Sequence, residues 1–380
     1  MKHWLRRQRY LADFTLAALA RRRVKNTGLI VIYSIIVFVL ASAMMFSAAL
    51  RNEAGTVLAK SPELIVQQLV MGRHEMISGS EIEKLAGIRG VASVKGRLWG
   101  YFYDSVNGAN YTFMVPDDES YALQPGEAIL GGGIGEARDF TWDTAPLFVT
   151  SLAGKMVKFN VRETFADDSA LLTADLVLIS EADFRSFFNL PPDVWTDIGV
   201  TIRNELEIAT IVGKAQLVMP NARFVTRSDI ERTYQRLFDW REGLMTALAA
   251  AGVLAFAIFA AEKASGLSAE EAREIGILKA IGWDTGDVIA MKLWEGGLIS
   301  FGAFLAGTVF AYLHVFSFQA GLFEPILKGW AVIYPDFALA PHVDGLQLAT
   351  LFAITVIPYT AATLVPIWRA ATADPDQVMR

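Results

Sequence analysis

Four long stretches of this sequence carry no charged side chain, and they limit the fold more than any other feature. A helix needs about 20 residues to cross a hydrocarbon core of about 30 Å, and each stretch is about that length or longer. The uncharged stretches are Thr27–Leu50, Gly243–Ala261, Gly296–Phe323 and Gly345–Trp368. The sequence therefore predicts a membrane protein with an α-helical four-span bundle, and we assign the spans to residues 27–50, 243–261, 293–318 and 346–368.

The overall composition agrees with that class of fold. The chain is 53% hydrophobic and 19% charged, and its mean hydropathy is +0.36. A soluble globular protein carries more charge, about a quarter of its residues. Because the sequence has no cysteine, a domain outside the cytoplasm would have to fold on its apolar core without disulfides.

Residues 1–26 carry a basic cluster against a single acid, Asp13. Its members are Lys2, Arg6, Arg7, Arg9, Arg21, Arg22, Arg23 and Lys25. Basic residues beside a span stay in the cytoplasm. Four spans across the bacterial inner membrane therefore place both termini, including the tail 369–380, on the cytoplasmic side. Apolar residues among the arginines predict a helix in the cytoplasmic interface. The alternative is a topology signal without a helix.

Residues 51–242 have ordinary polar content and lie outside the cytoplasm in this topology, as does the loop 319–345. The β-rich runs are 91–115, which contains the hairpin signal Asn107-Gly108, and 154–164, 174–180, 197–203 and 222–226. The helical runs are 80–87, opened by Ser80, and 181–189 and 204–218. We therefore predict an extracytoplasmic α+β domain.

Two features concern the helices beyond that domain. From Ser228, with Glu231 three positions on, a helix is expected to run into the second span as a rigid stalk. His314 lies in the third uncharged stretch, and a histidine inside a span is a functional candidate. Because that stretch is longer than a span needs, we expect His314 near the outer end and in contact with water.

The sequence lacks the motifs of an enzyme that acts alone. It has no G-x-x-x-x-G-K-[ST] phosphate loop, no H-E-x-x-H and no G-x-S-x-G. The glycine-rich stretch 130–137 has the wrong spacing for a dinucleotide site and predicts a turn before a helix. We therefore expect a non-catalytic chain that binds no cofactor itself. One soft-ligand group remains, Met71, His74 and Met76, which could bind cuprous copper or serve only packing.

The segment 271–282, within the predicted cytoplasmic loop 262–292, reads as a short amphipathic helix that stops at Gly282. Its expected stripe is Ile275, Leu278 and Ile281, and such a stripe is unfavourable in water unless something covers it. The cover could be lipid, this chain's own helices, or a groove on a partner subunit.

This segment and two others resemble the FtsX-like permeases of the MacB/LolC type. The stretch "REIGILKAIG" matches the family pattern after the second span, Glu295 lies where the family has an acidic residue, and Trp283 replaces the usual alanine. The tail 366–380 and the element 126–137 are also similar to the family. The resemblance covers essentially the whole chain.

The resemblance implies the permease subunit of an ABC transporter, with a MacB-type periplasmic core and a coupling helix that docks on a separate ATPase. The residues carried over for docking are Arg273, Glu274, Ile275, Gly276, Leu278, Lys279, Ile281 and Gly282. ATP and Mg would then be bound by two copies of the ATPase, and a second permease chain would complete a homodimer in membrane lipid. No nucleic acid is implied.

By the same resemblance, ATP hydrolysis would drive a periplasmic conformational change (mechanotransmission) for export or extraction of a cargo. Two alternatives stay open. One is a lipoprotein-releasing permease. The other is a non-transport regulator of a periplasmic partner, in copper or metal-protein maturation for example. The corresponding partners are a periplasmic adaptor, a lipoprotein or a metal-handling protein.

Overall fold

The computed structural model describes residues 2–58, 61–138, 146–165, 173–233, 236, 243, 247, 250, 252–254, 269–325, 332–333 and 339–372. The chain divides into two compact units. The helical unit comprises Met1–Ala49, Asp239–Ala320 and Pro341–Arg380, and the α+β unit comprises Leu50–Phe238 and Gly321–Ala340.

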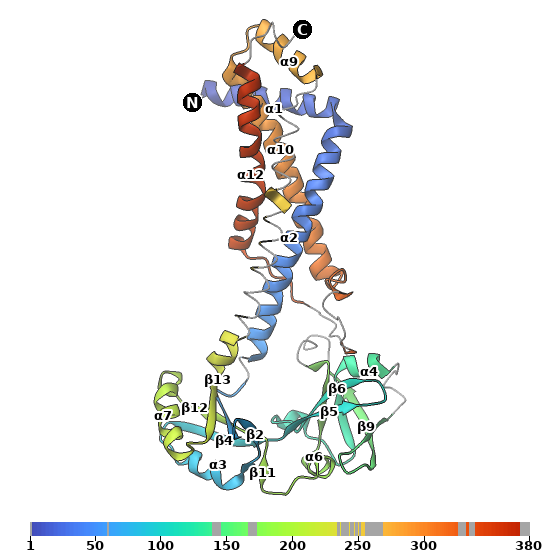
Figure 1. Cartoon of the computed structure of the whole chain (residues 1–380), viewed down its shortest axis with the longest axis vertical. Helices are drawn as coiled ribbons and strands as arrows, with labels where there is room; N and C mark the ends of the chain where they lie inside the picture. Colours follow the sequence, from blue (N-terminus) through green and yellow to red (C-terminus); the bar gives the residue numbers. More distant parts are fainter. Residues whose placement is uncertain are drawn as a thin grey trace. The chain divides into compact units, whose positions relative to one another are not determined.

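The described helices of the helical unit are α1 (Lys2–Arg21), α2 (Arg23–Leu58, the residues up to Ala49), α9 (Ala269–Ala280), α10 (Thr285–Tyr312) and α12 (Gly345–Thr372). A π-helical turn, Leu313–Ser317, continues α10. The helices α2, α10 and α12 run alongside one another, and α1 lies crosswise at one end of them (Figure 1). The fold therefore separates a lengthwise bundle from a crosswise N-terminal helix.

Two described helices are long and apolar enough to cross a membrane, Asn26–Glu53 and Thr285–Ser317, and Gly345–Ala361 is a shorter apolar helix. The predicted spans 27–50 and 293–318 overlap the first two helices, and the predicted span 346–368 lies within α12 but extends past the apolar segment that ends at Ala361. The helix that holds the third span begins earlier than expected, directly after the turn at Gly282. Most of the predicted span 243–261 lies outside the described residues, so the four-span bundle stays a prediction.

The lengthwise helices approach each other closely at small residues. A Cβ atom on Gly307 of α10 would lie 2.7 Å from Val37 Cβ and 2.8 Å from the backbone oxygen of Ser34 on α2. Glycine thus lets the two backbones meet, which is the usual way in which helices pack in lipid. Farther along, Tyr33 of α2 is fully buried and stacks on Tyr359 of α12 at 5.2 Å.

His314 lies in the π-helical turn and is buried, with 6% of its surface exposed. Its Nδ1 is 3.2 Å from Ser42 Oγ, and its ring meets Phe38 edge-on. The expectation of a wet histidine is therefore wrong. The bundle continues past the length that a span needs, so α2 still covers this position.

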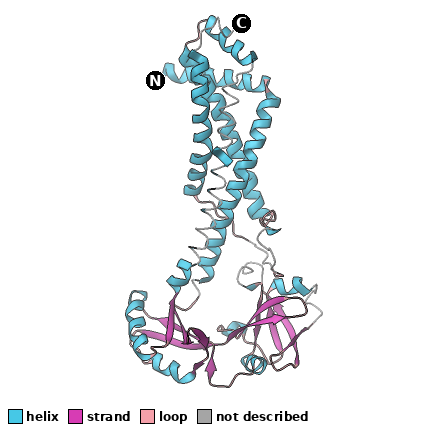
Figure 2. Ribbon diagram, viewed as in Figure 1, coloured by secondary structure: helices cyan, strands magenta, loops and turns pink. Residues whose placement is uncertain are grey.

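The described part of the α+β unit holds two larger sheets, which Figure 2 shows, and one two-stranded ladder. The first has the order β13-β1-β12-β4, with β2 paired to β1. Its strands are β1 (Leu64–Val70), β2 (Arg73–Glu75), β4 (Val91–Arg97), β12 (Asp197–Ile202) and β13 (Ala222–Thr226). Helices α3 (Gly79–Ala86) and α7 (Ile208–Val218) supply Leu85, Ile211 and Ala215 to its core.

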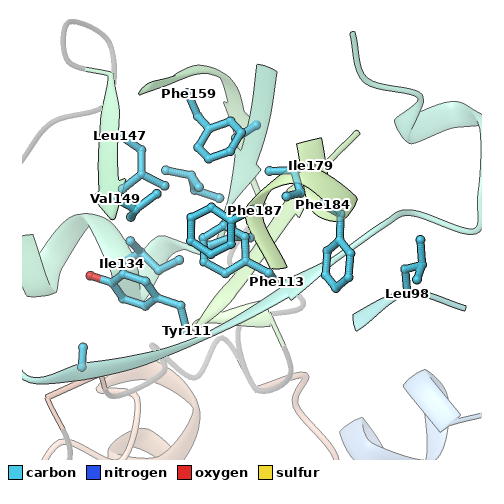
Figure 3. Close-up of a cluster of buried hydrophobic side chains, with 14 residues drawn as sticks. Leu98, Tyr111, Phe113, Ile134, Leu147, Val149, Phe159, Ile179, Phe184 and Phe187 are labelled. Carbon is cyan, nitrogen blue, oxygen red and sulfur yellow. The ribbon is translucent and has the colours of Figure 1, made fainter. Parts of the chain in front are cut away.

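The second sheet has the order β5-β6-β10-β7-β9-β8. Its strands are β5 (Trp99–Asp104), β6 (Ala109–Met114), β7 (Glu127–Leu130), β8 (Leu147–Thr150), β9 (Met156–Thr164) and β10 (Leu176–Ile179). Helix α6 (Glu181–Phe188) contributes Phe184 and Phe187 to an aromatic core (Figure 3). The expected hairpin at Asn107-Gly108 is confirmed as β5–β6. The glycine-rich stretch 130–137, expected as a turn before a helix, is itself mostly helical, because α4 spans Gly132–Arg138.

The two sheets are joined where β4 passes into β5. Asp197, 1% exposed, accepts hydrogen bonds from Arg97 Nε at 2.6 Å and Nη2 at 2.7 Å, and from Trp99 Nε1 at 2.9 Å. A short two-stranded ladder pairs β3 (Ile77–Ser78) with β11 (Val194–Trp195), and β11 ends shortly before Asp197 in the chain. The buried Asp197 carboxylate thus accepts from one charged donor, Arg97, and one neutral donor, Trp99. These bonds offset the free-energy cost of removing the carboxylate from water.

Within the α+β unit, the segment that follows α2 lies beside the segment that follows β13. The strands β1 and β13 pair from Leu64 with Thr226 onward, and the Arg227 backbone N–H donates to Glu63 O at 3.0 Å. The Arg227 side chain also binds the backbone oxygen of Ser61 and, at 2.8 Å, the Glu63 carboxylate. The segment that follows α2 is therefore tied to the helix that begins after β13.

Two predicted helix starts differ from the structure. The helix expected from Ser228 begins at Arg227, and its cap is Thr226, whose Oγ1 accepts from the Asp229 N–H at 3.2 Å. The helix expected from Ser80 begins at Gly79 after Ser78. Both regions offer more than one hydroxyl residue within two positions, so the pattern alone cannot select the cap. The predicted stalk between residues 234 and 242 lies almost wholly outside the described residues.

Candidate docking surface on the α9 helix

The helix α9 ends in a defined stop at Gly282. This glycine has φ +101°, which residues with a Cβ rarely adopt. The Gly282 N–H donates to Lys279 O at 3.1 Å and the Trp283 N–H donates to Leu278 O at 3.0 Å. This pair of bonds is a Schellman motif, which satisfies the last carbonyl groups of a helix. The stop that the sequence predicted is confirmed, and it turns the chain directly into α10.

One face of α9 is covered by other helices of the same unit. Leu278 is 6% exposed and packs with Leu11 of α1 and Met291 of α10. Ile275 is 3% exposed and packs with Val288 of α10. The expectation that Ile275 and Leu278 form an exposed stripe is therefore wrong. The chain's own helices cover them, which was one of the alternatives that the sequence left open.

Ion pairs hold α9 and α10 against α1. The Glu274 carboxylate is 3.1 Å from Arg21 Nη2 and 2.6 Å from Arg22 Nη2. At the start of α10, Asp287 Oδ1 is 2.8 Å from Arg7 Nε. Glu274 was carried over as a docking residue, but its carboxylate binds this chain's own arginines. The basic cluster of residues 1–26 thus orients α9 as well as marking a topology.

The opposite face of α9 is exposed. Ile277 is 49% exposed and Ile281 is 69% exposed. Arg273 lies one turn before Ile277 and is also exposed, as is Gly282. Residues 273, 277 and 281 are four positions apart, so they lie on one side of the helix. We call Arg273, Ile277 and Ile281 the outer stripe of α9.

The remaining carried-over residues take different places. Gly276 is buried and Lys279 is half-buried. Glu295 lies inside α10, where its carboxylate is 2.6 Å from Lys292 Nζ on the same helix. A turn-to-turn pair of this kind stabilises its own helix. The outer stripe contains Ile277, which the sequence reading of the docking site omitted. Its signal was present, since Ile277 and Ile281 are spaced by four residues.

The predicted soft-ligand group lies in the α+β unit. Met71 is at the turn between β1 and β2, has φ 52° and is fully exposed. His74, on β2, has its ring 6.0 Å from that of Trp99, and Met76 is 37% exposed. Among the described residues there is no group of three or more His, Cys, Asp or Glu side chains that could hold a metal ion. The copper site stays a prediction.

Two comparisons with known proteins bear on this surface. Residues 244–375 match the family model of the FtsX-like permease C-terminal domain. The matched segment includes α9, with its glycine stop, together with α10 and the whole of α12. A comparison with curated proteins found no match.

Proposed function

This chain belongs to the FtsX-like permeases through its C-terminal domain, and from that premise we propose that it couples ATP hydrolysis on a separate ATPase subunit to movement of its α+β unit. Membership of the family makes the chain a membrane protein and, in general terms, a membrane subunit of the ABC transporter class, which works with an ATPase partner. The proposal concerns how this chain meets that partner.

In the proposal, the outer stripe of α9 docks on the ATPase. One observation carries it: two isoleucines are exposed on a helix whose other face is fully packed. An apolar stripe on a rigid helix suits a groove in a partner, where specificity comes from side chains at successive turns. Because Leu278 and Ile275 are anchored within the unit, force on the stripe would pass to α1 and α10 instead of bending α9.

The α+β unit has features that suit a domain moved by the helices connected to it. Two chain segments far apart in sequence, Leu50–Phe238 and Gly321–Ala340, belong to it, and Ile333 of the second segment packs on its aromatic core. The Arg227 contacts tie the segment after α2 to the helix after β13. A displacement of either helix would therefore reach the same sheet. In this proposal both segments lie on the extracytoplasmic side of the inner membrane, and both termini of the chain lie in the cytoplasm.

The test is co-purification of the ATPase with variants of the full chain. Ile281→Asp removes an apolar contact of about 1.5–3 kcal/mol and leaves an unpaired carboxylate in the groove. We expect at least a tenfold weaker association for Ile281→Asp, and a similar loss for Ile277→Asp. Ile281→Leu keeps the apolar volume and should retain the ATPase.

Leu278→Asp is the contrasting variant. Its side chain packs against Leu11 and Met291, so we expect this change to lower the amount of folded chain in the membrane. At equal amounts of folded protein, wild-type recovery of the ATPase with both Ile277→Asp and Ile281→Asp would rule out the outer stripe as the docking surface.

A further inference from the structure

A groove of about 610 Å³ lies between α1 and the turn that joins α9 to α10. Its wall includes Arg6, Arg7, Tyr10, Phe14, Trp283 and Asp287. The Phe14 and Trp283 rings lie 5.3 Å apart. The groove therefore combines an aromatic wall with cationic side chains. The outer stripe of α9 does not contribute to it.

The charges of the groove are arranged for an anion. Arg7 is oriented by Asp287, with its Nη2 2.5 Å and its Nε 2.8 Å from Asp287 Oδ1. Arg6 is exposed, and the structure shows no ion pair for it among the described residues. The two arginines and one aspartate leave one net positive charge. A group with a single negative charge, such as a phosphodiester, would neutralise the groove.

The surroundings of the groove point to a lipid as the source of that anion. Helix α1 lies crosswise to α2, α10 and α12 (Figure 1), as expected of a helix in the plane of a membrane surface. Its uncovered side bears Tyr10, 72% exposed, and Leu16, 53% exposed, next to the exposed Arg6 and Arg9. Aromatic and basic side chains gather at the headgroup level of a bilayer, and basic pockets between helices on the cytoplasmic side bind anionic headgroups.

We propose that this groove binds one anionic phospholipid of the cytoplasmic leaflet. Arg6 and Arg7 contact the phosphate, and the glycerol and upper acyl chain lie against the rings of Tyr10 and Trp283. The site relies on the proposed orientation of the chain in the membrane, with α1 on the cytoplasmic side. It does not rely on ATPase docking. Because Gly282 and Trp283 belong to the groove, the bound lipid also supports the turn that ends α9.

The test is native mass spectrometry of the full chain in a mild detergent, without the ATPase, after equal additions of phosphatidylglycerol and phosphatidylcholine. We expect one retained phosphatidylglycerol, in preference to phosphatidylcholine. One arginine contact near a headgroup corresponds to about a fivefold change in binding, so Arg6→Gln should lower the retention of phosphatidylglycerol about fivefold. Arg9→Gln changes an exposed arginine of the same helix outside the groove and should retain it as the wild type does.

Several outcomes would overturn the proposal. Equal retention in Arg6→Gln and the wild type would show that the groove does not bind the lipid. An equal loss in Arg9→Gln would indicate a diffuse basic surface in place of a site. Displacement of the lipid by millimolar inorganic phosphate would indicate a soluble anion as the ligand. Arg6→Gln can also be compared with the wild type in the separate ATPase co-purification assay. Unchanged lipid retention together with a loss of the ATPase in that assay would assign the groove to the ATPase.

Discussion

In the α+β unit, the core of the second sheet is filled with aromatic rings, whereas in the helical unit a glycine of one helix meets the backbone of another. Phe113 stacks on Phe187 at 4.8 Å inside the α+β unit. Gly307 lies against Ser34 O and Val37 in the helical unit. The first kind of contact removes large apolar surfaces from water. The second brings two backbones together without any large side chain between them.

The difference indicates which solvent each unit is adapted to. On α2, Val31, Ile35 and Val39 are 51%, 56% and 50% exposed, and their four-residue spacing places them on one side of the helix. In water such a stripe would be unfavourable. In lipid, such a stripe needs no further cover. The stability of the helical unit therefore depends on the close fit between its helices, and the stability of the α+β unit depends on the hydrophobic effect.

The largest expected effect is on the aromatic core of the α+β unit. Phe187 is 1% exposed, so Phe187→Ala leaves a cavity and should destabilise the unit by about 3–5 kcal/mol. Because the chain has no cysteine, a single cysteine in place of the buried Ala128 reports opening of this core through its rate of thiol labelling in the full chain. Phe148→Ala, at a position 47% exposed on β8, is the matched control, with an expected effect below about 1 kcal/mol. Similar labelling rates in the two variants would contradict an aromatic core as the main support.

An intermediate effect is expected where the helices meet. Gly307→Ala would place a Cβ atom 2.8 Å from Ser34 O, and overpacking of this kind costs about 1–3 kcal/mol. Gly302→Ala, on the same helix, meets no atom within 4 Å and should be neutral or slightly stabilising, because alanine favours a helix over glycine. The measurement is the thermal unfolding midpoint of each variant in detergent. A common shift in both variants would refute shape-dependent packing at Gly307.

The sequence alone was sufficient to predict structural features that are determined within one short segment of the chain. The stop at Gly282 depends on local backbone geometry, and the observed φ of +101° agrees with it. The predicted runs 154–164 and 197–203 correspond to β9 and β12, because short runs rich in β-branched and apolar residues favour a strand through their own side chains.

The buried side of α9 could not be read from the sequence in the same way. Its motif has apolar residues all around the helix, so Ile275 with Leu278 and Ile277 with Ile281 are two equally regular stripes. The choice between them depends on α1 and on Arg21 and Arg22, which pair with Glu274 from about 250 positions away in the sequence. A contact so distant leaves no local pattern. The groove beside Trp283 escaped prediction for the same reason.

The smallest expected effect concerns the helix that begins at Arg227. Thr226 caps it, since its Oγ1 accepts from the Asp229 N–H at 3.2 Å and its own N–H donates to Asp229 Oδ2 at 3.1 Å. Thr226→Ala should cost about 1 kcal/mol. Ser228→Ala tests the cap that the sequence suggested and should cost less than about 0.5 kcal/mol.

The same cap gives a pH dependence. Hydrogen bonds from the Thr226 side chain and backbone hold the pKa of Asp229 below its ordinary value. A carboxyl group with a lowered pKa in the folded state stabilises that state at pH values above its ordinary pKa, and the contribution is lost as the pH falls through the lowered pKa. The stability difference between the wild type and Thr226→Ala should therefore be complete at pH 7 and smaller at pH 3, as measured by denaturant unfolding of the full chain at both values. A larger loss for Ser228→Ala than for Thr226→Ala, or a difference that grows on acidification, would refute this cap.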